Sequence, residues 1–438
     1  MNRSGGRRPE RRVLAALWLL VFAVTSQALI LAPILPRMSE QLGIPLARLG
    51  MLVTGYAVAV AVVALMAGPV SDRVGRRRML LAGAAAMAAG LALHALADGF
   101  AALLAVRVLT GAGGGVLTGA TAAYVADYFP PERRGWANGW VTSGMAVGQI
   151  VGIPLGTLLA AGWGFRLPFL CFGAAMALAG VLVWRWVPEA AAARAERSGG
   201  ALDARGAAAG YAALLREPRV GVAVAAYWAT YLGTTLHTLF LPAWLERARG
   251  LTPGEVATLF AVGGAATALA GPVAGRLCDR LGRKRLTVAA SVGLAAAVLA
   301  TPWAARGAWS AYAVFAVAAA LTAARGAPFQ TLLTELVPER RRGSLMSLSM
   351  ATGQVGWGVG AVLAGPAFAR WGYAGNAVGA AAAALAVALL VGRWVPETAA
   401  PPALTPRPAP PPPRPRGAPS PPPPGSAAAA RRGPGRAP

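Results

Sequence analysis

Twelve apolar segments alternate with short polar segments along most of this chain. A helix needs about 20 apolar residues to cross a bilayer, and each segment is close to that length. The pattern therefore predicts an all-α, polytopic membrane protein with twelve transmembrane helices. The predicted helices are 13–35, 46–70, 79–97, 100–126, 136–161, 167–186, 220–244, 253–277, 286–304, 309–336, 344–369 and 373–391.

The distribution of positive charge predicts how these helices are oriented. Of the 41 Lys and Arg residues, 32 fall in the two termini and in every second polar segment between the helices. Such charge gathers on the cytoplasmic side of membrane proteins. We therefore expect a multi-pass protein of the bacterial plasma membrane with both termini in the cytoplasm. The net charge of +25 follows the loops and forms no single basic face, which argues against nucleic acid as a partner.

The polar segment after the second predicted helix returns in the second half of the chain. Residues 68–78 read Gly-Pro-Val-Ser-Asp-Arg-Val-Gly-Arg-Arg-Arg, and residues 275–285 read Gly-Arg-Leu-Cys-Asp-Arg-Leu-Gly-Arg-Lys-Arg, 207 positions later. Further matches at an offset of 208 are Asp127 with Glu335, Gly148 with Gly356, Gly152 with Gly360, and Trp-Val-Pro-Glu at 186–189 with 394–397. Two similar six-helix bundles, related by an axis along the membrane normal, are predicted.

The repeat and the composition divide the chain into five regions. They are a cytoplasmic N-terminus (1–12), a first bundle (13–187), a cytoplasmic linker (188–218), a second bundle (219–397) and a disordered Pro/Ala/Arg-rich cytoplasmic tail (398–438). The linker is predicted to hold one or two short helices at the lipid headgroups, or to be a plain tether. A tract as rich in proline as the tail cannot bury an apolar core.

These motifs resemble those of the major facilitator superfamily. The resemblance covers residues 13–398 and rests on the two copies of the charged turn at this spacing. Within the superfamily, the chain is similar to the twelve-helix drug:proton antiporters and the arabinose-efflux-like permeases. The resemblance implies alternating access between the two bundles and proton-coupled efflux of a small drug-like or amphipathic organic compound.

The charged turns form a predicted gate. In the family, such residues latch the two halves together in the outward-facing state. The resemblance assigns this role to Gly68, Asp72, Arg73, Gly75, Arg76, Asp127, Gly275, Asp279, Arg280, Gly282, Arg283 and Glu335. Glycine at the first position of each motif lets another helix approach, and the later glycine allows a tight turn. The alternative is a set of arginines that snorkel to the headgroups and only fix the topology.

Small residues recur every four positions in the fifth predicted helix. They are Gly144, Gly148, Gly152 and Gly156, with Pro154 between the last two. Glycines at this spacing let another helix pack closely, and a proline bends a helix. In the family, a fifth helix rich in glycine and proline marks antiporters. Helix packing alone would explain the same residues.

Two arginines and a histidine fall inside predicted helices. A charge at such depth is costly and usually faces a cavity or a partner. Arg107 lies about two turns into the fourth helix, where the family has an arginine implicated in proton transfer, and no acid is available to it in helices 1, 2, 3 or 5. Arg325, in the tenth helix, is predicted to contact a substrate anion or to act in gating. His237, in the seventh, is a candidate for titration in the cavity.

Helices 1, 4, 7 and 10 are expected to line a central cavity, with helices 2, 5, 8 and 11 at its sides. Their polar and aromatic residues at mid-depth are candidate substrate contacts. These are Gln27, Tyr56, Trp140, Gln149, Tyr231, Gln330 and Gln354. For each of them, a place in the core or at the lipid interface is an equal alternative.

Other chemistry finds no support in the sequence. There is no phosphate-binding loop, no metal-ligand spacing and no nucleophile triad, so we expect no cofactor, no metal and no enzymatic activity. Lipid, a small molecule and protons are the expected partners of a monomer. An importer or exchanger of a sugar, nucleoside, amino acid or organic anion is an alternative function, and a non-transporting membrane sensor is a more remote one.

Overall fold

The computed structural model describes residues 7–189 and 204–397. Within these ranges, the side chains of 7–9, 68, 69, 72, 204–208, 339 and 340 are outside the description. The predicted tail and part of the predicted linker also lie outside the described residues. The described residues belong to one compact unit, Met1–Thr398, and they form helices and no strand.

The first half of the unit contains the helices up to α9. They are α1 (Arg7–Leu29), α2 (Leu31–Leu42), α3 (Leu46–Leu49), α4 (Met51–Val74), α5 (Arg76–Leu93), η1 (His94–Leu96), α6 (Phe100–Tyr128), α7 (Pro131–Val147), η2 (Gly148–Gly152), α8 (Ile153–Trp163) and α9 (Arg166–Trp186). The fifth predicted helix is thus α7 and α8, joined by one turn of π-helix, η2.

The second half begins with a short helix in the predicted linker. Its elements are α11 (Ala204–Arg216), α12 (Pro218–Thr238), α13 (Leu241–Arg249), α14 (Pro253–Leu281), α15 (Arg283–Ala304), α16 (Ala308–Glu335) and α17 (Glu339–Trp394). Helix α11 packs against α12 and α17, so one of the short linker helices predicted is present.

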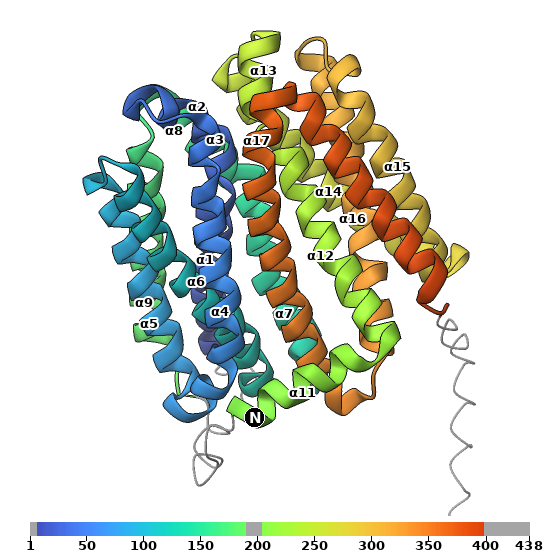
Figure 1. The fold of residues 1–438 in the computed structure, drawn as a ribbon. Coiled ribbons are helices and arrows are strands. Elements are labelled where there is room, and N and C mark those ends of the chain that lie inside the picture. The colour runs from blue at the N-terminus through green and yellow to red at the C-terminus, as the bar shows by residue number, and fades with distance from the viewer. Residues whose placement is uncertain (1–6, 190–203, 398–438) are drawn as a thin grey trace, which may run out of the picture. The chain divides into compact units, whose positions relative to one another are not determined.

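The structure confirms the predicted fold class. Among the described residues, ten helices are long and apolar enough to cross a membrane. Those ten leave out α12 and count α17 once, although α17 covers the last two predicted spans. Helix α17 changes direction at Gly372, whose φ of 61° lies in the left-handed region that favours glycine. Figure 1 shows the two limbs of α17 side by side with α12 and α15.

The seventh predicted helix is shorter in the structure than in the prediction. The prediction ran to residue 244, but α12 ends at Thr238 and α13 begins at Leu241 with Pro242 in its first turn. Proline has no backbone N–H to continue the hydrogen-bond ladder, and it is well suited to the first turn of a new helix. The first predicted helix divides in the same way, into α1 and α2.

The two charged turns have the same local structure. Gly75 follows α4 with a φ of 103°, and Gly282 follows α14 with a φ of 87°. The backbone N–H of Gly75 bonds to the carbonyl of Ser71, and that of Gly282 bonds to the carbonyl of Cys278. The prediction of a tight glycine turn in each half is therefore confirmed.

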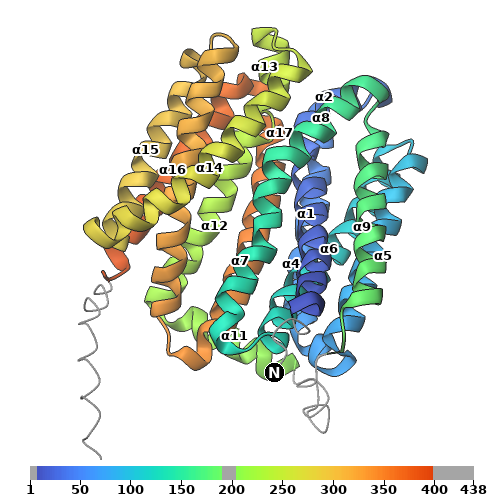
Figure 2. The same cartoon turned by 180° about the vertical axis from the view of Figure 1, so that it is seen from behind.

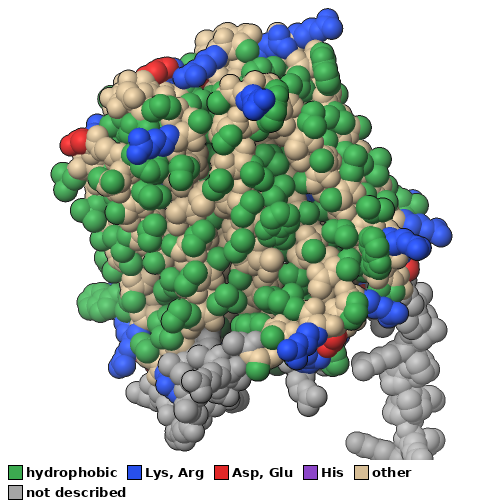
Figure 3. Space-filling view, viewed as in Figure 1, with side chains coloured by type: hydrophobic (Ala, Val, Ile, Leu, Met, Phe, Trp, Pro, Cys, Tyr) green, Lys and Arg blue, Asp and Glu red, His purple; other side chains and the backbone are tan. Residues whose placement is uncertain are grey.

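Exposed tryptophans lie near both ends of the helices. One group contains Trp163, Trp303, Trp309 and Trp371, and the other contains Trp136, Trp140, Trp184 and Trp394. Between these groups, much of the surface is apolar, and green side chains cover most of it in Figure 3. Tryptophan is enriched where a membrane meets water, so the two groups mark the borders of the membrane-spanning region.

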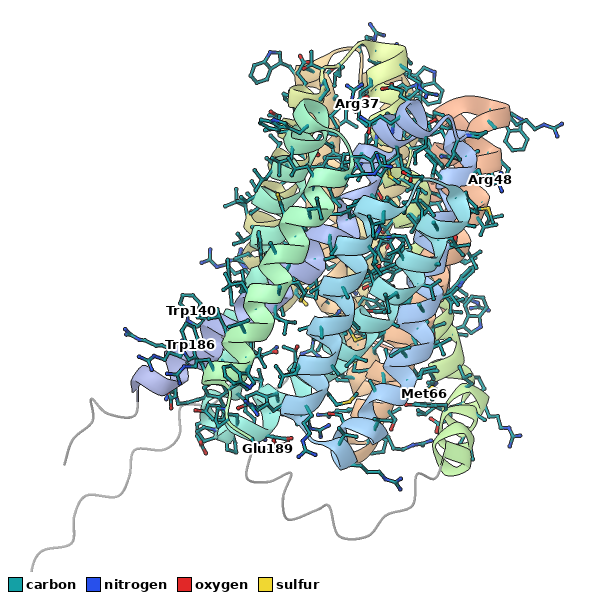
Figure 4. The ribbon with its side chains drawn as sticks, turned by 90° about the vertical axis from the view of Figure 1, so that its left-hand side faces the viewer. Arg37, Arg48, Met66, Trp140, Trp186 and Glu189 are labelled. Carbon is teal, nitrogen blue, oxygen red and sulfur yellow. The ribbon has the colours of Figure 1, made fainter. Side chains whose placement is uncertain are left out.

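We call the end with the turns at Gly75 and Gly282 the motif end, and the opposite end the α13 end. Figures 1 and 2 show α2, α3 and α13 at one end and the N-terminus with α11 at the other. Figure 4 shows Arg37 and Arg48 at the α13 end, and Met66, Trp140, Trp186 and Glu189 toward the motif end.

The two halves pack closely toward the α13 end. A Cβ added to Gly365 of α17 would lie 2.7 Å from the carbonyl oxygen of Ala47. The hydroxyl of Thr54 on α4 donates to the carbonyl of Gly358 on α17 over 2.9 Å. Helix α2 of the first half contacts α13 of the second, and α8 contacts α14. These contacts close the α13 end.

Candidate functional site

A cavity of about 300 Å³ lies between the two halves. Its wall contains residues of α1, α2, α4, η2 and α8 from the first half and of α12, α14, α15, α16 and α17 from the second. Aromatic rings in the wall include Phe260, Phe315 and Trp357. The volume is at the lower end of the range for small-molecule sites, and most of the wall is apolar.

A line of threonines runs along the wall on α12. Thr230, Thr234 and Thr238 each donate their hydroxyl to the carbonyl four residues earlier, over 2.8 to 2.9 Å. Thr267 of α14 and Thr322 of α16 also reach the wall and bond in the same way. Their oxygen lone pairs can still accept hydrogen bonds from a ligand. Sequence reasoning missed this line, although the spacing of four residues was visible.

Arg325 lies in the wall on α16. The residue is 2% exposed, and its Nε has no hydrogen-bond partner among the described residues. The hydroxyl of Tyr231 interacts with its guanidinium electrostatically. An arginine at the centre of a membrane helix costs about 3 kcal/mol on insertion scales. The described residues of the wall include no acid that would offset this cost.

Arg107 is also buried, but it lies outside the cavity wall. Its guanidinium is 4.7 Å from the centre of the Tyr56 ring, and its Nη1 donates to Gln27 Oε1 over 3.3 Å. Gln27 Nε2 donates to the Tyr56 hydroxyl over 3.0 Å, so α1, α4 and α6 meet in one polar cluster. A cation over an aromatic face gains about 1 kcal/mol. The sequence named all three residues but did not predict that they meet.

His237 lies in the wall near the end of α12. Its Nδ1 is 2.7 Å from the hydroxyl of Tyr373, and its ring lies 6.0 Å from that of Phe315. Its Nε2 has no hydrogen-bond partner among the described residues. The structure therefore places this histidine at the predicted cavity, with one nitrogen held by α17.

Gln149 is the one predicted amide that lies in the wall, and it comes from η2. A π-helical turn changes the direction of side chains and is frequent at functional sites. Pro154 lies in the first turn of α8, directly after η2.

The predicted glycine face of the fifth helix packs against α1. A Cβ on Gly152 would lie 2.0 Å from Ser26 Oγ, and one on Gly144 would lie 2.7 Å from the carbonyl oxygen of Trp18. Gly148 faces the same helix, while Gly156 meets Ile30, between α1 and α2, and Phe172 of α9. These contacts support the packing explanation of the motif. The second half repeats them, because Gly356 and Gly360 of α17 face the backbone of α12.

The other predicted cavity contacts lie outside the wall of this cavity. Tyr231 is half-buried, and its hydroxyl is 3.3 Å from that of Tyr227. Gln354 is half-buried with no partner for its Oε1 among the described residues. Trp140 and Gln330 are exposed. Three of the predicted residues at mid-depth, Gln149, His237 and Arg325, thus share one cavity.

Ion pairs at the motif end join helices of the same half. Arg76 Nε lies 2.9 Å from Asp127 Oδ2, and Arg283 pairs with Glu335 at the equivalent place in the second half. Asp279 and Arg280 are exposed, and so is Arg73. The surroundings of Gly68 and Asp72, which were also assigned to the gate, are not among those that the structure describes. A Cβ on Gly275 would meet no atom within 4 Å, so the helix approach predicted at this glycine is absent in this conformation.

A second pair of ion pairs was missed in the sequence. Arg133 of α7 lies 2.7 Å from Glu10 of α1, and Arg341 of α17 lies 2.7 Å from Glu217 beside α12. The arginines are 208 residues apart and the glutamates 207, which is the offset of the repeat. The offset of the repeat could therefore have predicted both ion pairs from the sequence.

A charged contact crosses between the halves at the α13 end. Arg37 of α2 pairs with Glu40 over 2.9 Å and also interacts electrostatically with Glu246 of α13. Burial raises the pKa of the half-buried Glu246 carboxyl, while Arg37 and Arg247 oppose this rise and Glu40 adds to it.

Comparison with known families finds two successive matches in this chain. The sequence model of the Major Facilitator Superfamily matches residues 17–231 and residues 223–434. The second match begins near the start of α12, the first long helix of the second half.

Individual relatives agree with this assignment. Over 357 residues the chain is 25% identical to the uncharacterised MFS-type transporter YceJ of Bacillus subtilis, covering 80% of this chain and 88% of that protein. Over 184 residues it is 30% identical to the multidrug resistance protein MdtG of Yersinia enterocolitica, covering 41% of this chain and 44% of that protein. The crystal structure of a D-xylose-proton symporter has the same fold, with a TM-score of 0.72, 18% identity, and coverage of 89% of this chain and 98% of that one.

Proposed function

Because the chain belongs to the Major Facilitator Superfamily, we propose that it is a secondary transporter that exports a small amphipathic organic compound in exchange for protons. The observation that carries this proposal is the largely apolar cavity between two halves that are closed at the α13 end. The similarity to a multidrug resistance protein supports an amphipathic substrate and export.

The distribution of arginine indicates which end of the molecule faces the cytoplasm in this proposal. With both termini in the cytoplasm, the motif end faces the cytoplasm of a bacterium and the α13 end faces outward. The structure then corresponds to an inward-facing state, in which a cytoplasmic compound can reach the cavity. Substrate and protons would act by shifting the equilibrium between this state and the outward-facing one.

Two side chains are proposed for proton coupling. His237 has an ordinary pKa close to neutrality as a free side chain, lies in the cavity wall and contacts Tyr373. Arg107 has no acid beside it, and we propose that it acts through the Gln27 and Tyr56 cluster. The predicted gate would then open and close the motif end around these groups.

A second function is favoured by a different observation. The threonine line and Gln149 offer acceptors and an amide to a hydroxylated compound. An importer or exchanger of a sugar or nucleoside would use the same cavity, and a D-xylose-proton symporter shares the fold. The direction of substrate movement distinguishes this function from export.

The test is accumulation of fluorescent dyes by membrane vesicles that have the cytoplasmic face outward. Vesicles with the protein are energised to acidify their interior and given an anionic, a neutral or a cationic dye, with and without an uncoupler. The proposal expects accumulation that the uncoupler abolishes and that Asp72→Asn reduces. The matched control is Glu132→Gln, an exposed acid outside the predicted gate.

Each result of this experiment decides a part of the proposal. Accumulation that survives the uncoupler would contradict proton exchange and favour facilitated transport. Accumulation no greater than in vesicles without the protein would contradict export of these compounds. Loss of activity in Glu132→Gln as large as in Asp72→Asn would contradict a specific role for the gate.

A further inference from the structure

Acidic side chains are missing from the middle of the membrane-spanning region. The chain has 16 Asp and Glu residues, and among the described residues none falls in the central part of a membrane-spanning helix. Those on the long helices lie in the first or last turn, as Asp127, Glu255 and Glu335 do. Glu40 and Glu246 lie on the short helices α2 and α13. The two buried arginines therefore have no carboxylate at their depth.

These two arginines differ in how the protein accommodates them. Arg107 donates from Nη1 to the Gln27 amide and lies over the Tyr56 ring, outside the cavity wall, and its Nε and Nη2 have no hydrogen-bond partner among the described residues. Arg325 is in the wall and 2% exposed, and its Nε has no hydrogen-bond partner among the described residues. A buried guanidinium with an unsatisfied donor is costly, and an anion that bonds to it from the cavity would reduce that cost. The cavity wall therefore favours a negative charge at one place, which is beside Arg325.

We propose that the cavity binds an organic monoanion, with a carboxylate or a group of similar shape against the guanidinium of Arg325. The planar guanidinium can donate two parallel hydrogen bonds to a carboxylate. Thr322 is one helical turn from Arg325, and Phe260 and Phe315 provide a surface for an aromatic or aliphatic body. This inference rests on the proposed function, because it names the substrate class of the same cavity.

The charge of the wall also determines what the cavity rejects. The wall has Arg325 and no acid among its described residues, so a cationic compound would meet like charge in a medium of low polarity. A neutral compound would leave the arginine unpaired. We therefore expect the order of affinity to be anion first, neutral compound second and cation last.

Three dansyl compounds test this order because they share one fluorophore. Dansylglycine is an anion, dansylamide is neutral and dansylcadaverine is a cation at neutral pH. Fluorescence titration of the purified full-length protein in detergent gives the three dissociation constants. Dansylglycine should bind about ten- to a hundredfold more tightly than dansylamide, which is the usual size of a hydrogen bond to a charged group.

Variants of the two arginines separate Arg325 from buried positive charge in general. Arg325→Gln should bind dansylglycine and dansylamide equally, while Arg325→Lys should keep part of the preference as a point charge without the planar fork. Arg107→Gln is the matched control, a buried arginine outside the wall, and should keep the full preference. Retained binding of dansylamide shows that each variant is folded.

The outcomes decide between the alternatives. Equal binding of the three compounds by the parent protein, tighter binding of the cation, or no binding of any of them would overturn the inference. A preference for the anion that survives in Arg325→Gln would overturn the assignment to Arg325. Binding does not require transport, so Arg325-dependent binding without accumulation in vesicles would count against the proposed function and leave the anion site standing.

Discussion

The motif end and the α13 end of the molecule hold their charges in different ways. At the motif end, each half pairs its own arginines with its own acids, and the second half repeats the pairs of the first. The α13 end also has pairs within the first half, Arg37 with Glu40 and Arg166 with Asp98. There, however, small residues of one half touch the backbone of the other, while Arg37 interacts across the halves with Glu246.

This difference follows from what each end does in the observed conformation. At the motif end, each half provides partners for its own charges, which lowers the cost of placing them near lipid. At the α13 end, close packing holds the halves together, and Arg37 adds a charge interaction across them. Changes that act on one end and not on the other can therefore test the comparison.

The largest expected effect comes from crowding the closed end. Gly365→Leu would place a side chain where a Cβ already lies 2.7 Å from Ala47, and overpacking of this kind costs about 1–3 kcal/mol. This would shift the equilibrium about ten- to a hundredfold away from closure. The measurement is the alkylation rate of Thr54→Cys, which lies in the same contact, in a chain with Cys171→Ser and Cys278→Ser.

A glycine at the other end is the control for this change. Gly275→Leu should leave the alkylation rate at Thr54→Cys unchanged or lower it, since a Cβ there meets no atom within 4 Å. Equal acceleration by both leucines would mean that the rate reports general loosening of the protein and not closure of the α13 end.

A smaller effect is expected from breaking the predicted gate pairs. Arg76→Gln removes the ion pair with Asp127 at the motif end, and Arg283→Gln removes the ion pair with Glu335. Both pairs are partly exposed, so each loss is expected to cost about 1 kcal/mol. The two variants should lower the midpoint of thermal unfolding by similar amounts. A large difference between the two shifts in the midpoint would show that the equivalent ion pairs of the two halves do not contribute equally to stability.

The sequence repeat explains why several features of the fold could be predicted from the sequence. The two halves, the glycine turns and the pairing regions of Asp127 and Glu335 were visible because similar residues recur at an offset of 207 or 208 positions. The fold class followed from segment length alone. The pairs of Glu10 with Arg133 and of Glu217 with Arg341 were within reach of the same reasoning, since they obey the same offset.

The cavity was harder to predict because it depends on how helices face one another. The sequence placed Gln27, Tyr56 and Arg107 at mid-depth but could not tell that they bond to one another beside the cavity. It did not anticipate η2, which sets the direction of Gln149, or the line of threonines on α12. The break between α12 and α13 depended on Pro242, and the prediction passed over this residue.

The pH dependence of the closed end is the next test in size. The pKa of Glu246 is raised chiefly by burial, so the closed state binds a proton more readily than a state that exposes this carboxyl. Its contribution to closure is complete below the ordinary pKa of 4.5 and is lost as pH rises through the raised value. Closure should weaken as the pH rises, and Glu246→Gln should remove that part of the dependence.

Alkylation of Thr54→Cys at a series of pH values, corrected for ionisation of the thiol, provides the measurement for Glu246. Glu132→Gln is the control, because this exposed acid lies at the motif end. A dependence that is the same in the parent and in Glu246→Gln would assign the effect to another group.

The smallest effect concerns the ion pairs that only the structure revealed. Arg133 and Glu10 are 43% and 25% exposed, and Arg341 and Glu217 are 34% and 44% exposed, so each pair is expected to contribute about 0.5 kcal/mol. Reversing one charge, in Arg133→Glu or Arg341→Glu, should lower the thermal midpoint slightly, and the exchanged pair Glu10→Arg with Arg133→Glu should recover most of the loss. Equal coupling in the two halves would mean that the repeat preserves the energy of these pairs as well as their geometry. Coupling in only one half would mean that the motif end, like the cavity, has diverged between the halves.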